Sequence, residues 1–537
     1  MNIKSLQIFK ENQMPKVPDY KIIYNWDGAP QSYSEYPQSM EQFLEKTYAV
    51  MEDTQVGAHF WSMEGIDFLE IKKGHSPIKN PNMYLSASQF TGNENRLAMY
   101  ERGEDPHEAM IERGHELGID VYASIRMNDN HFSGMQPNEM ADSKHPSLSD
   151  FRREHPEYLI GNRTSEWFAL SYDFSIAAVR QHRFDSIKEI CELYNWDGVE
   201  LDWQRHAFHF DEDYGYRFRY TLTDLQRSVR KLADEISEKR GKPFYLAARV
   251  NGYIEMCNNI GYDIETWVDE GLVDILIPAG GADTETEAEV DKFKEICKGT
   301  DIVVYPGFDS GVSQMPAYAE GAYVKDQMRT RGLASRHFAK GADGIYVFNW
   351  HANGDTRREL LTTIGSTETL RATDKVYAAT RRHLVYEGAW RGAYRKDRLR
   401  GTVPVPLRET ITGDGPTCIL DIADDFTADK PKSVELRIRL QDWLKGDKVK
   451  VELNGQEISA LDTIYEHKAN PDPVYAYANQ SVSPVSDVTD TVWLSKDISL
   501  NQVKYGLNKV KVVSVERNKL IESDIVLTDV ELVVRFN

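Results

Sequence analysis

The chain has 537 residues, of which 41% are hydrophobic and 28% are charged, and its formal net charge is −21. This length exceeds what one hydrophobic core usually holds, so two or three domains are expected. The negative charge argues against nonspecific binding to nucleic acid or to an anionic membrane, and no apolar run reaches the roughly 18 residues that a membrane span needs.

Eight apolar segments alternate with amphipathic segments between residues 20 and 375. Hairpin signals between the apolar segments are lacking, so the pattern favours a closed (β/α)8 TIM barrel over a doubly wound sheet. The expected strands are Lys21–Trp26, Ala58–Met63, Asp120–Met127, Val199–Trp203, Phe244–Asn251, Val273–Pro278, Ile302–Pro306 and Gly344–Trp350. The expected helices are Ser39–Met51, Pro106–Leu117, Ala177–Tyr194, Tyr216–Lys239, Ile264–Glu270, Glu287–Cys297, Val324–Lys340 and Arg357–Ile364.

The remaining segments differ from the barrel pattern. Residues 1–19 are a polar N-terminal extension without the apolar centre of a signal peptide. Residues 376–401 start as a helix and continue as a basic linker. Residues 402–537 alternate with period two, and Asn454-Gly455 is typical of a tight hairpin turn, so an accessory β-sandwich is expected there. Its clearest strands are Ser433–Leu440, Lys448–Leu453, Val510–Val515 and Val526–Val534.

The run from Asn195 to His206 carries the strongest chemical signal. Side chains alternate across a strand, so Glu200, Asp202 and Gln204 are expected on one face. Two carboxylates so close together are costly in a core unless they are hydrogen-bonded or used in chemistry. The pattern therefore predicts an acid/base or nucleophile site at the end of a barrel strand, while capping of loops or pairing with arginines is the alternative.

Polar and aromatic residues gather where the other expected strands end, which is where barrel active sites lie. Aromatic rings that pack on sugar faces, and polar groups that bond sugar hydroxyls, would suit a carbohydrate. Packing of the tryptophans in the barrel, and pairing of the arginines with the site's own acids, are the alternatives. Besides Glu200 and Asp202, the candidate catalytic residues are Asp309 and Glu255; the candidate substrate-binding residues are Trp26, Trp61, Arg126, Asn128, Arg205, His206, Arg249, Asn251, Tyr305, Trp350 and His351.

No metal or cofactor is expected. The histidines His59, His131, His206, His209 and His351 lie in none of the usual metal-ligand spacings, and no phosphate-binding glycine loop stands out. The four cysteines are scattered, which predicts free, mostly buried thiols in a reducing compartment.

The segment from Trp167 to Phe210 contains Leu170-Ser171-Tyr172-Asp173-Phe174-Ser175 and Asp197-Gly198-Val199-Glu200-Leu201-Asp202-Trp203, followed by Arg205. It resembles the family-10-like glycosyl hydrolases, bacterial barrel proteins with a D-G-[IV]-x-L-D-[YFW]-x-R signature on the fourth strand. The signature maps onto Asp202 and Arg205, and the likeness departs from the family at His206-Ala207. The C-terminal region looks like the galactose-binding-like sandwiches appended to such enzymes.

The resemblance implies polysaccharide hydrolysis in a bacterial protein, either cytoplasmic or exported. Two carboxylates would cleave a glycosidic bond, with Asp202 as one of the pair and either retention or inversion open. The arginines suggest an anionic glycan, uronic or sulfated. A carbohydrate-binding protein on a degenerate barrel, and a non-hydrolytic enzyme such as a sugar lyase or isomerase, are the alternatives.

Overall fold

The structure is a computed structural model that describes residues 16–26, 30, 35–63, 87–130, 135, 137–140, 148–161, 169–211, 214–281, 284–309, 322–350, 355–380, 402–408, 414–465, 491–518 and 523–536. The chain divides into two compact units, residues 1–309 with 341–351, and residues 310–340 with 352–537. The predicted domain limits at 19/20, 375/376 and 401/402 stay predictions.

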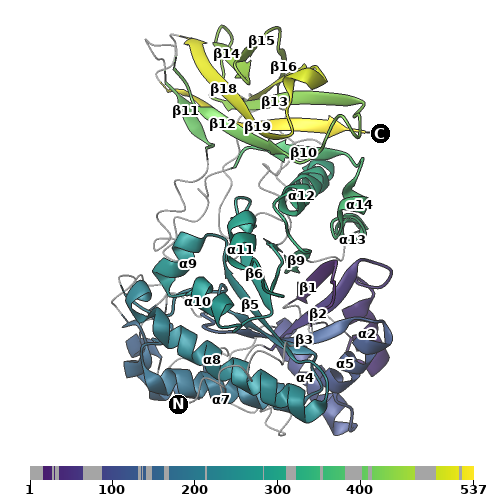
Figure 1. The fold of residues 1–537 in the computed structure, drawn as a ribbon, viewed down its shortest axis with the longest axis vertical. Coiled ribbons are helices and arrows are strands. Elements are labelled where there is room, and N and C mark those ends of the chain that lie inside the picture. Colours follow the sequence, from purple (N-terminus) through teal and green to yellow (C-terminus); the bar gives the residue numbers. More distant parts are fainter. Residues whose placement is uncertain are drawn as a thin grey trace. The chain divides into compact units, whose positions relative to one another are not determined.

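The first unit is built on one parallel sheet (Figure 1) with the strand order β7-β6-β5-β4-β3-β2-β1-β9-β8. Most of its strands lie within two residues of their predicted limits. The bounds are β1 Ile22–Trp26, β2 Val56–Ser62, β3 Asp120–Arg126, β4 Gly198–Asp202, β5 Tyr245–Asn251, β6 Ile275–Ala279, β7 Val303–Val304, β8 Gly307–Asp309 and β9 Ile345–Phe348.

The sheet closes on itself at its seventh barrel strand. β7 and β8 stand at opposite ends of the strand order, yet only Tyr305 and Pro306 separate them in the chain. The Tyr305 N–H donates to the Leu276 carbonyl at 2.9 Å, and the Tyr346 N–H donates to the Pro306 carbonyl at 3.1 Å. Proline has no N–H to continue the ladder, which explains the break. The predicted (β/α)8 barrel is therefore confirmed.

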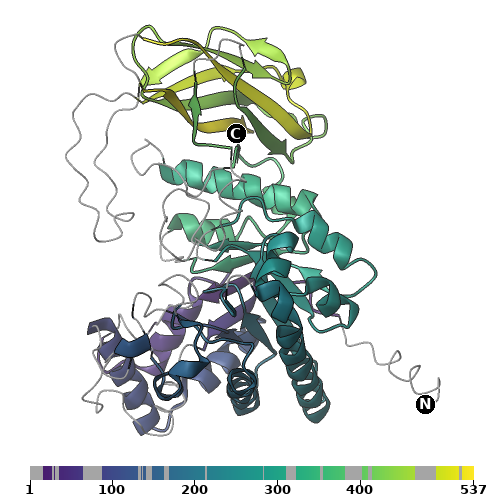
Figure 2. The same ribbon diagram turned by 90° about the vertical axis from the view of Figure 1, so that its left-hand side faces the viewer.

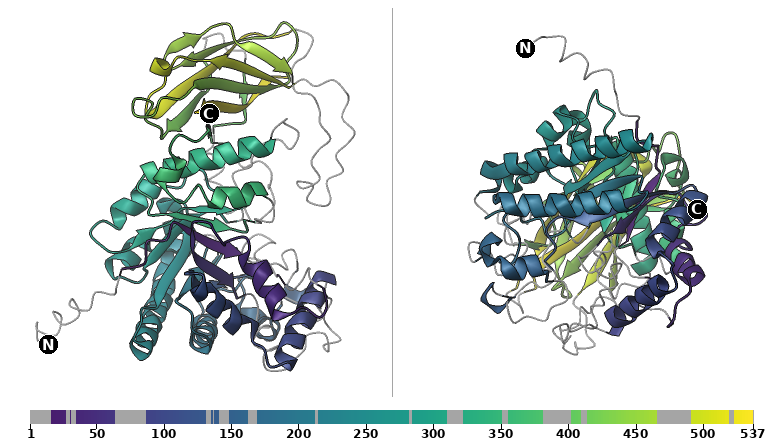
Figure 3. Two further views of the ribbon diagram at one scale, coloured as in Figure 1. Left: turned by 90° about the vertical axis from the view of Figure 1, so that its right-hand side faces the viewer. Right: turned by 90° about the horizontal axis from the view of Figure 1, so that it is seen from below.

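Helices follow the strands of this unit, and the long helices α7 and α8 lie side by side (Figure 3). The sequence did not predict α4 or α9; α4 contains glycine, threonine and two asparagines, which are weak helix formers. The bounds are α2 Met40–Tyr48, α4 Ala87–Glu101, α5 Pro106–Glu116, α6 Asp150–Glu154, α7 Ala177–Leu193, α8 Gly215–Arg240, α9 Ile254–Ile260, α10 Ile264–Asp269 and α11 Val290–Ile296, with 3-10 turns at Pro137–Glu139 and Pro156–Tyr158.

Aromatic and aliphatic side chains together form one buried apolar cluster in the barrel. The ring of Phe60 stacks on that of Tyr122 with 4.4 Å between centroids. Gly198, at the start of β4, faces this cluster, and a Cβ there would lie 2.3 Å from the Tyr122 ring and 2.4 Å from the Tyr245 carbonyl oxygen. The glycine of the D-G-V-E-L-D motif is therefore required by packing.

The second unit contains the predicted sandwich (Figure 2), with a buried apolar core between two antiparallel sheets. One sheet has the order β10-β19-β13-β17-β16, with β11 beside β19, and the other has the order β12-β18-β14-β15. The predicted Asn454-Gly455 turn joins β14 to β15, and both residues have positive φ. The bounds are β10 Lys375–Ala378, β11 Val405–Leu407, β12 Thr417–Ile422, β13 Ser433–Gln441, β14 Lys448–Leu453, β15 Gln456–Ile458, β16 Asp462–Tyr465, β17 Val492–Asp497, β18 Gly506–Glu516 and β19 Ile525–Arg535.

Helices α12 (Ala322–Ala339), α13 (Asp355–Leu361) and α14 (Thr367–Leu370) also belong to the second unit. Arg329 of α12 forms buried ion pairs with Glu531 and Asp529 of β19. Gly332 allows α12 to approach β10, because a Cβ there would lie 2.3 Å from the Val376 carbonyl oxygen. The predicted helical start of the linker at residue 376 is wrong, since the chain pairs there with β19 as a strand. The basic residues 381–400 lie outside the described residues.

Two further expectations concern the whole chain. All four cysteines are buried and unbridged, as predicted. Within the described ranges, every helix is too short or too polar to cross a lipid bilayer.

Candidate active site

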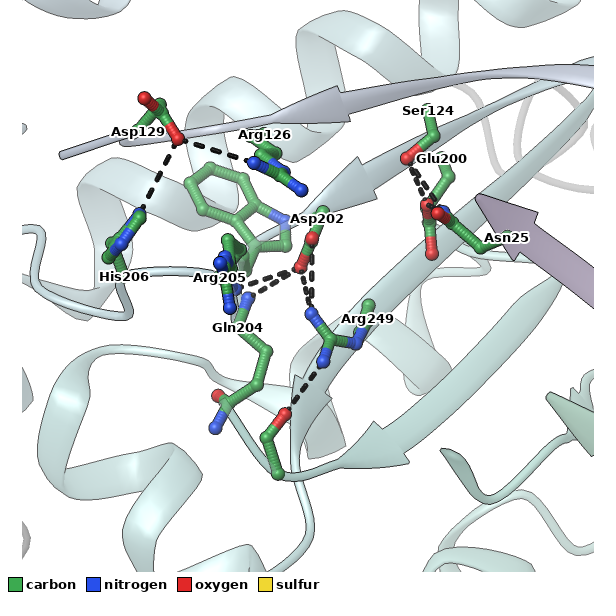
Figure 4. A network of polar contacts seen from close by, with 12 residues as sticks. Asn25, Ser124, Arg126, Asp129, Glu200, Asp202, Gln204, Arg205, His206 and Arg249 are labelled. Atoms are coloured by element: carbon green, nitrogen blue, oxygen red, sulfur yellow. Dashed lines mark hydrogen bonds and ion pairs between the residues drawn. The ribbon is translucent and has the colours of Figure 1, made fainter. Parts of the chain in front are cut away.

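Asp202, the last residue of β4, is a buried carboxylate with every oxygen engaged (Figure 4). The Arg249 Nη1 donates to Oδ1 at 3.0 Å and to Oδ2 at 3.1 Å. The backbone N–H groups of Gln204 and Arg205 donate to Oδ1 at 3.1 and 2.9 Å. Asp202 is thus held in one position by a cation and two backbone donors.

The register of the parallel strands creates this arrangement. Arg126 of β3 pairs with Asp202 of β4, and Asp202 pairs with Arg249 of β5. Because side chains in register on neighbouring strands point to the same face, the carboxylate lies between two arginines. Arg249 also donates from Nη2 to the Gly280 carbonyl at 2.8 Å, which fixes the chain after β6.

Glu200 lies two residues earlier on β4, deeper in the barrel, and has a different environment. Its Oε2 accepts hydrogen bonds from the Ser124 hydroxyl and, at 2.9 Å, from Asn25 Nδ2. Burial, and next the nearby Asp202 charge, raise the pKa of Glu200 to about 7, against the opposing effects of Ser124 and Arg249. The Tyr346 hydroxyl also interacts with the Glu200 carboxyl and lowers its pKa, as a smaller effect than those of Ser124 and Arg249. The two carboxyl groups therefore lie in different environments: Asp202 is paired with a cation, whereas Glu200 is buried and hydrogen-bonded to neutral groups.

The strand expected to carry Glu200, Asp202 and Gln204 on one face ends one residue before its predicted limit, so Gln204 does not share that face. β4 stops at Asp202, whose carboxylate caps the next two N–H groups and turns the chain. The amide end of Gln204 consequently leads away from both carboxyl groups (Figure 4).

Three arginines surround the ring of Phe348 on β9. Their guanidinium carbons lie 4.3 Å (Arg249), 5.8 Å (Arg126) and 5.9 Å (Arg205) from the ring centroid. Distances up to about 6 Å allow cation–π attraction. The predicted gathering of these arginines at the barrel mouth is therefore observed, although Arg249 is occupied by Asp202.

Asp129 links two predicted binding residues beside this group. Its Oδ1 lies 3.6 Å from Arg126 Nη1 and 3.6 Å from His206 Nδ1. The His206 Nδ1 accepts the Asn130 N–H at 3.1 Å, and His206 adopts a φ of 55°. This left-handed backbone returns the chain toward the loop after β3.

Several other predicted residues serve packing or loop structure. Trp61 packs with Phe43 of α2 and His107 of α5, outside the barrel, and the Tyr305 hydroxyl donates to the Tyr20 carbonyl at 2.9 Å, before β1 begins. The structure therefore places neither beside the two carboxyl groups.

The side chains of Asn128 and Asn251 form hydrogen bonds with backbone groups and do not contact the carboxyl groups of Glu200 and Asp202. The Asn128 side chain donates to the carbonyls of Tyr172 and Phe208, and Asn251 Oδ1 accepts the Tyr253 N–H at 3.0 Å.

The remaining candidates are placed as follows. Trp26 ends β1 and is half-buried, and Trp350 is buried against Phe308. Glu255 is exposed in the first turn of α9. Asp309 ends β8, but its side chain lies outside what is described, as do His351 and His131.

The sequence places Asn25 and Asp129 at strand ends without assigning them a role, and it does not single out Ser124, Tyr346 or Phe348. Ser124 stands two positions before Arg126 and shares its face, which is the one sequence signal that would have pointed to it. For the described residues, no group of three or more acidic, histidine or cysteine side chains has a geometry that would hold a metal ion.

Comparisons with known proteins give distant likenesses only. No family model matches the chain, so the resemblance to family-10-like glycosyl hydrolases stays a prediction. No curated protein matches it either. Solved structures similar to it include the C-terminal domain of a putative chitinase from Desulfitobacterium hafniense, with a TM-score of 0.37 and 13% identity over 65% of this chain and 99% of that one.

Two further solved structures are similar over most of this chain. An Anoxybacillus alpha-amylase has a TM-score of 0.34 and 11% identity, covering 93% of this chain and 99% of that one. A GH36 alpha-galactosidase from Geobacillus stearothermophilus has a TM-score of 0.34 and 10% identity, covering 98% of this chain and 57% of that one. This chain spans little more than half the length of that galactosidase and of a Paenibacillus glucanotransferase, of which it covers 57%. At these scores the likenesses bear on neither the activity nor the substrate.

Proposed function

We propose that this protein is a glycoside hydrolase that cleaves a poly- or oligosaccharide with Glu200 and Asp202. The observation that carries the proposal is the buried carboxyl pair on one barrel strand, in which burial raises the pKa of Glu200 to about 7 while Arg249 and two N–H groups surround Asp202. Two carboxyls with opposed environments are what acid-assisted glycoside cleavage needs.

The roles follow from the two environments. Glu200, whose pKa burial raises to about 7, donates its proton to the leaving glycosidic oxygen. Asp202 stabilises the positive charge that develops at the anomeric carbon, and either attacks this carbon or activates the water that does. One water is consumed, its hydroxyl ending on the anomeric carbon and its remaining proton returning to the carboxyl pair.

The contacts of Glu200 support its part in this proposal. Asn25 Oδ1, on the same amide group whose nitrogen donates to Glu200, is a buried polar atom without a hydrogen-bond partner among the described residues. Buried polar atoms are normally satisfied, so an unsatisfied one beside a carboxyl fits a place where a sugar hydroxyl or a water binds.

A second candidate is a carbohydrate-binding protein without turnover. The full occupation of both Asp202 oxygens and the burial of both carboxyl groups favour it, because such a carboxylate is a good structural anchor. In that case the polar and arginine-rich end of the barrel would bind glycan, and Glu200 would only contribute to the structure of the binding site.

The two candidates differ in the effect of removing the acid. Glu200→Gln keeps the size and the hydrogen bonds of the side chain but cannot donate a proton. For the hydrolase we expect a loss of turnover of at least about 100-fold, as general acids contribute, with binding of the oligosaccharide retained. Turnover that Glu200→Gln leaves intact would contradict the assigned role, and binding without turnover in the unmodified protein would favour the second candidate.

A further inference from the structure

Helix α12 packs on the sandwich, although the chain forms it between two barrel strands. β8 ends at Asp309 and β9 begins at Ile345, and α12 lies between them in the chain. In a (β/α)8 barrel each strand is followed by a helix of the outer ring. This helix nevertheless groups with residues 352–537, and it lies against β10 (Figure 1). The sandwich therefore holds a helix that comes from the barrel part of the chain.

The contact between α12 and the sandwich is buried and extends along the helix. Met328 of α12 forms an apolar cluster with Val376 of β10 and Val533 of β19, and all three side chains are 2% exposed. Arg336, near the end of the helix, lies 3.7 Å from Asp421 of β12. The positions 328 and 336 are about two helical turns apart. Three strands of the sandwich thus contact one side of α12.

The charged part of this contact makes the dependence mutual. Glu531 and Asp529 of β19 have side chains that are 0% and 2% exposed, and both pair with Arg329 of α12. Asp529 also lies 3.8 Å from Arg439, whereas Arg329 is the one cation that contacts Glu531 among the described residues. A buried carboxylate that loses its cation is strongly destabilising. The sandwich therefore needs α12 as much as α12 needs the sandwich.

The C-terminal end of α12 is connected to the barrel by a short segment. Residues 340–344 separate the helix from β9. Within this segment the Asp343 carboxylate accepts the Val304 N–H at 2.8 Å and pairs with Lys294 at 2.6 Å. A segment this short with one residue fixed leaves little slack. Loss of α12 from the sandwich would therefore disturb the start of β9, the strand that carries Tyr346 and Phe348.

We propose that the sandwich is a structural part of the barrel's fold, so that the two units unfold together through α12. Elements that share a buried interface and a short connection open as one cooperative unit. Such coupling does not depend on the activity of the barrel. The sandwich is in this respect a stabilising element and not a module that the barrel can lose.

Native-state hydrogen exchange of the full chain, measured by mass spectrometry of its peptides, tests this coupling. Arg329→Met changes the side of α12 that faces the sandwich and leaves every barrel strand intact. We expect the slowest peptides of β4 and β5 in the barrel, and of β13 and β19 in the sandwich, to exchange faster by one common factor of about 100-fold or more. Faster exchange confined to β13 and β19 would overturn the proposal, because the barrel would then unfold independently. Unchanged exchange in both units would overturn it as well, because Arg329 would then not hold α12 to the sandwich.

Three further variants make the result interpretable. Arg371→Met removes a more exposed ion pair, with Asp429 of the same unit, and should leave both sets of peptides unchanged. Gly332→Ala perturbs the interface independently, since the added methyl group would meet the Val376 carbonyl oxygen, and it should accelerate both sets equally. If Arg329→Met does not fold, Arg329→Lys keeps the charge but weakens the pairing. Equal acceleration in the two units would again support the coupling, and acceleration in the sandwich alone would contradict it.

Discussion

The ion pair between Asp202 and Arg249 gives the sharpest quantitative prediction. Both side chains are almost completely buried, with exposed fractions of 0% and 1%, so solvent does not screen the charges. Arg249→Met keeps much of the apolar stem but removes the guanidinium group that contacts both oxygens of Asp202. Removing one partner of a buried pair costs about 3–5 kcal/mol, and for a large domain this lowers Tm by roughly 6–20 °C. Urea unfolding followed by tryptophan fluorescence measures the change in the free energy of unfolding.

Two comparisons make the result interpretable. Arg227→Met removes an ion pair on the same barrel whose side chains are 42% and 38% exposed, and it should cost less than about 1 kcal/mol. The double variant Arg249→Met/Asp202→Asn removes the stranded charge and should recover part of the lost stability. If Arg249→Met costs no more than Arg227→Met, the reasoning from burial and register is refuted.

Four further predictions follow, two from the environment of Glu200 and two from contacts elsewhere in the protein. The pKa of Glu200 is raised from 4.5 to about 7, so between these pH values the folded protein retains a proton that the unfolded chain releases. The free energy of unfolding should therefore fall as pH rises through this window. Glu200→Gln should remove that fall in a pH series of urea titrations. Since the hydroxyl of Ser124 lowers the pKa of Glu200, Ser124→Ala should move the alkaline limb of the pH–rate profile to higher pH; an unmoved limb would assign it to another group. Arg329→Met leaves Glu531 buried without its cation and should destabilise the second unit by about 3–5 kcal/mol in the same urea assay. Gly198→Ala should lower the free energy of unfolding of the barrel by roughly 3 kcal/mol or more, because the added methyl group overpacks the interior.

The element pattern was predictable because it depends on local signals. Alternation of apolar strands with amphipathic helices located the eight barrel strands, and Asn454-Gly455 located a hairpin turn, since both of its residues need positive φ. Helix α4 has weak propensity and an apolar pattern that is not strong, so its formation depends on packing that the sequence does not reveal.

The direction of side chains was harder to predict in the buried strands. Trp61 and Phe60 are both apolar, so the sequence of β2 does not indicate which of them faces the barrel interior. Phe60 packs against Tyr122 inside the barrel and Trp61 packs against helix α2, so the structure does not place Trp61 beside the two carboxyl groups.

The pairing inside the site also depended on information beyond the local sequence. Arg249 contacts Asp202, which is 47 residues away in the chain, and Ser124 contacts Glu200, which is 76 residues away. Both contacts follow from the register of neighbouring strands. The motif around Asp202 therefore indicated where the site lies, whereas the register of the strands decides which side chains contact the two carboxyl groups.

The most direct test of the proposed hydrolase is the identity of the products. The protein is incubated with neutral, uronic and sulfated oligosaccharides in ¹⁸O-labelled water, and the products are separated by chromatography and analysed by mass. Hydrolysis predicts shorter oligosaccharides that carry one ¹⁸O from water, and their absence when Glu200→Gln replaces the unmodified protein. Unsaturated or rearranged products, or substrates that are bound and recovered intact across the set, would contradict a two-carboxylate glycoside hydrolase.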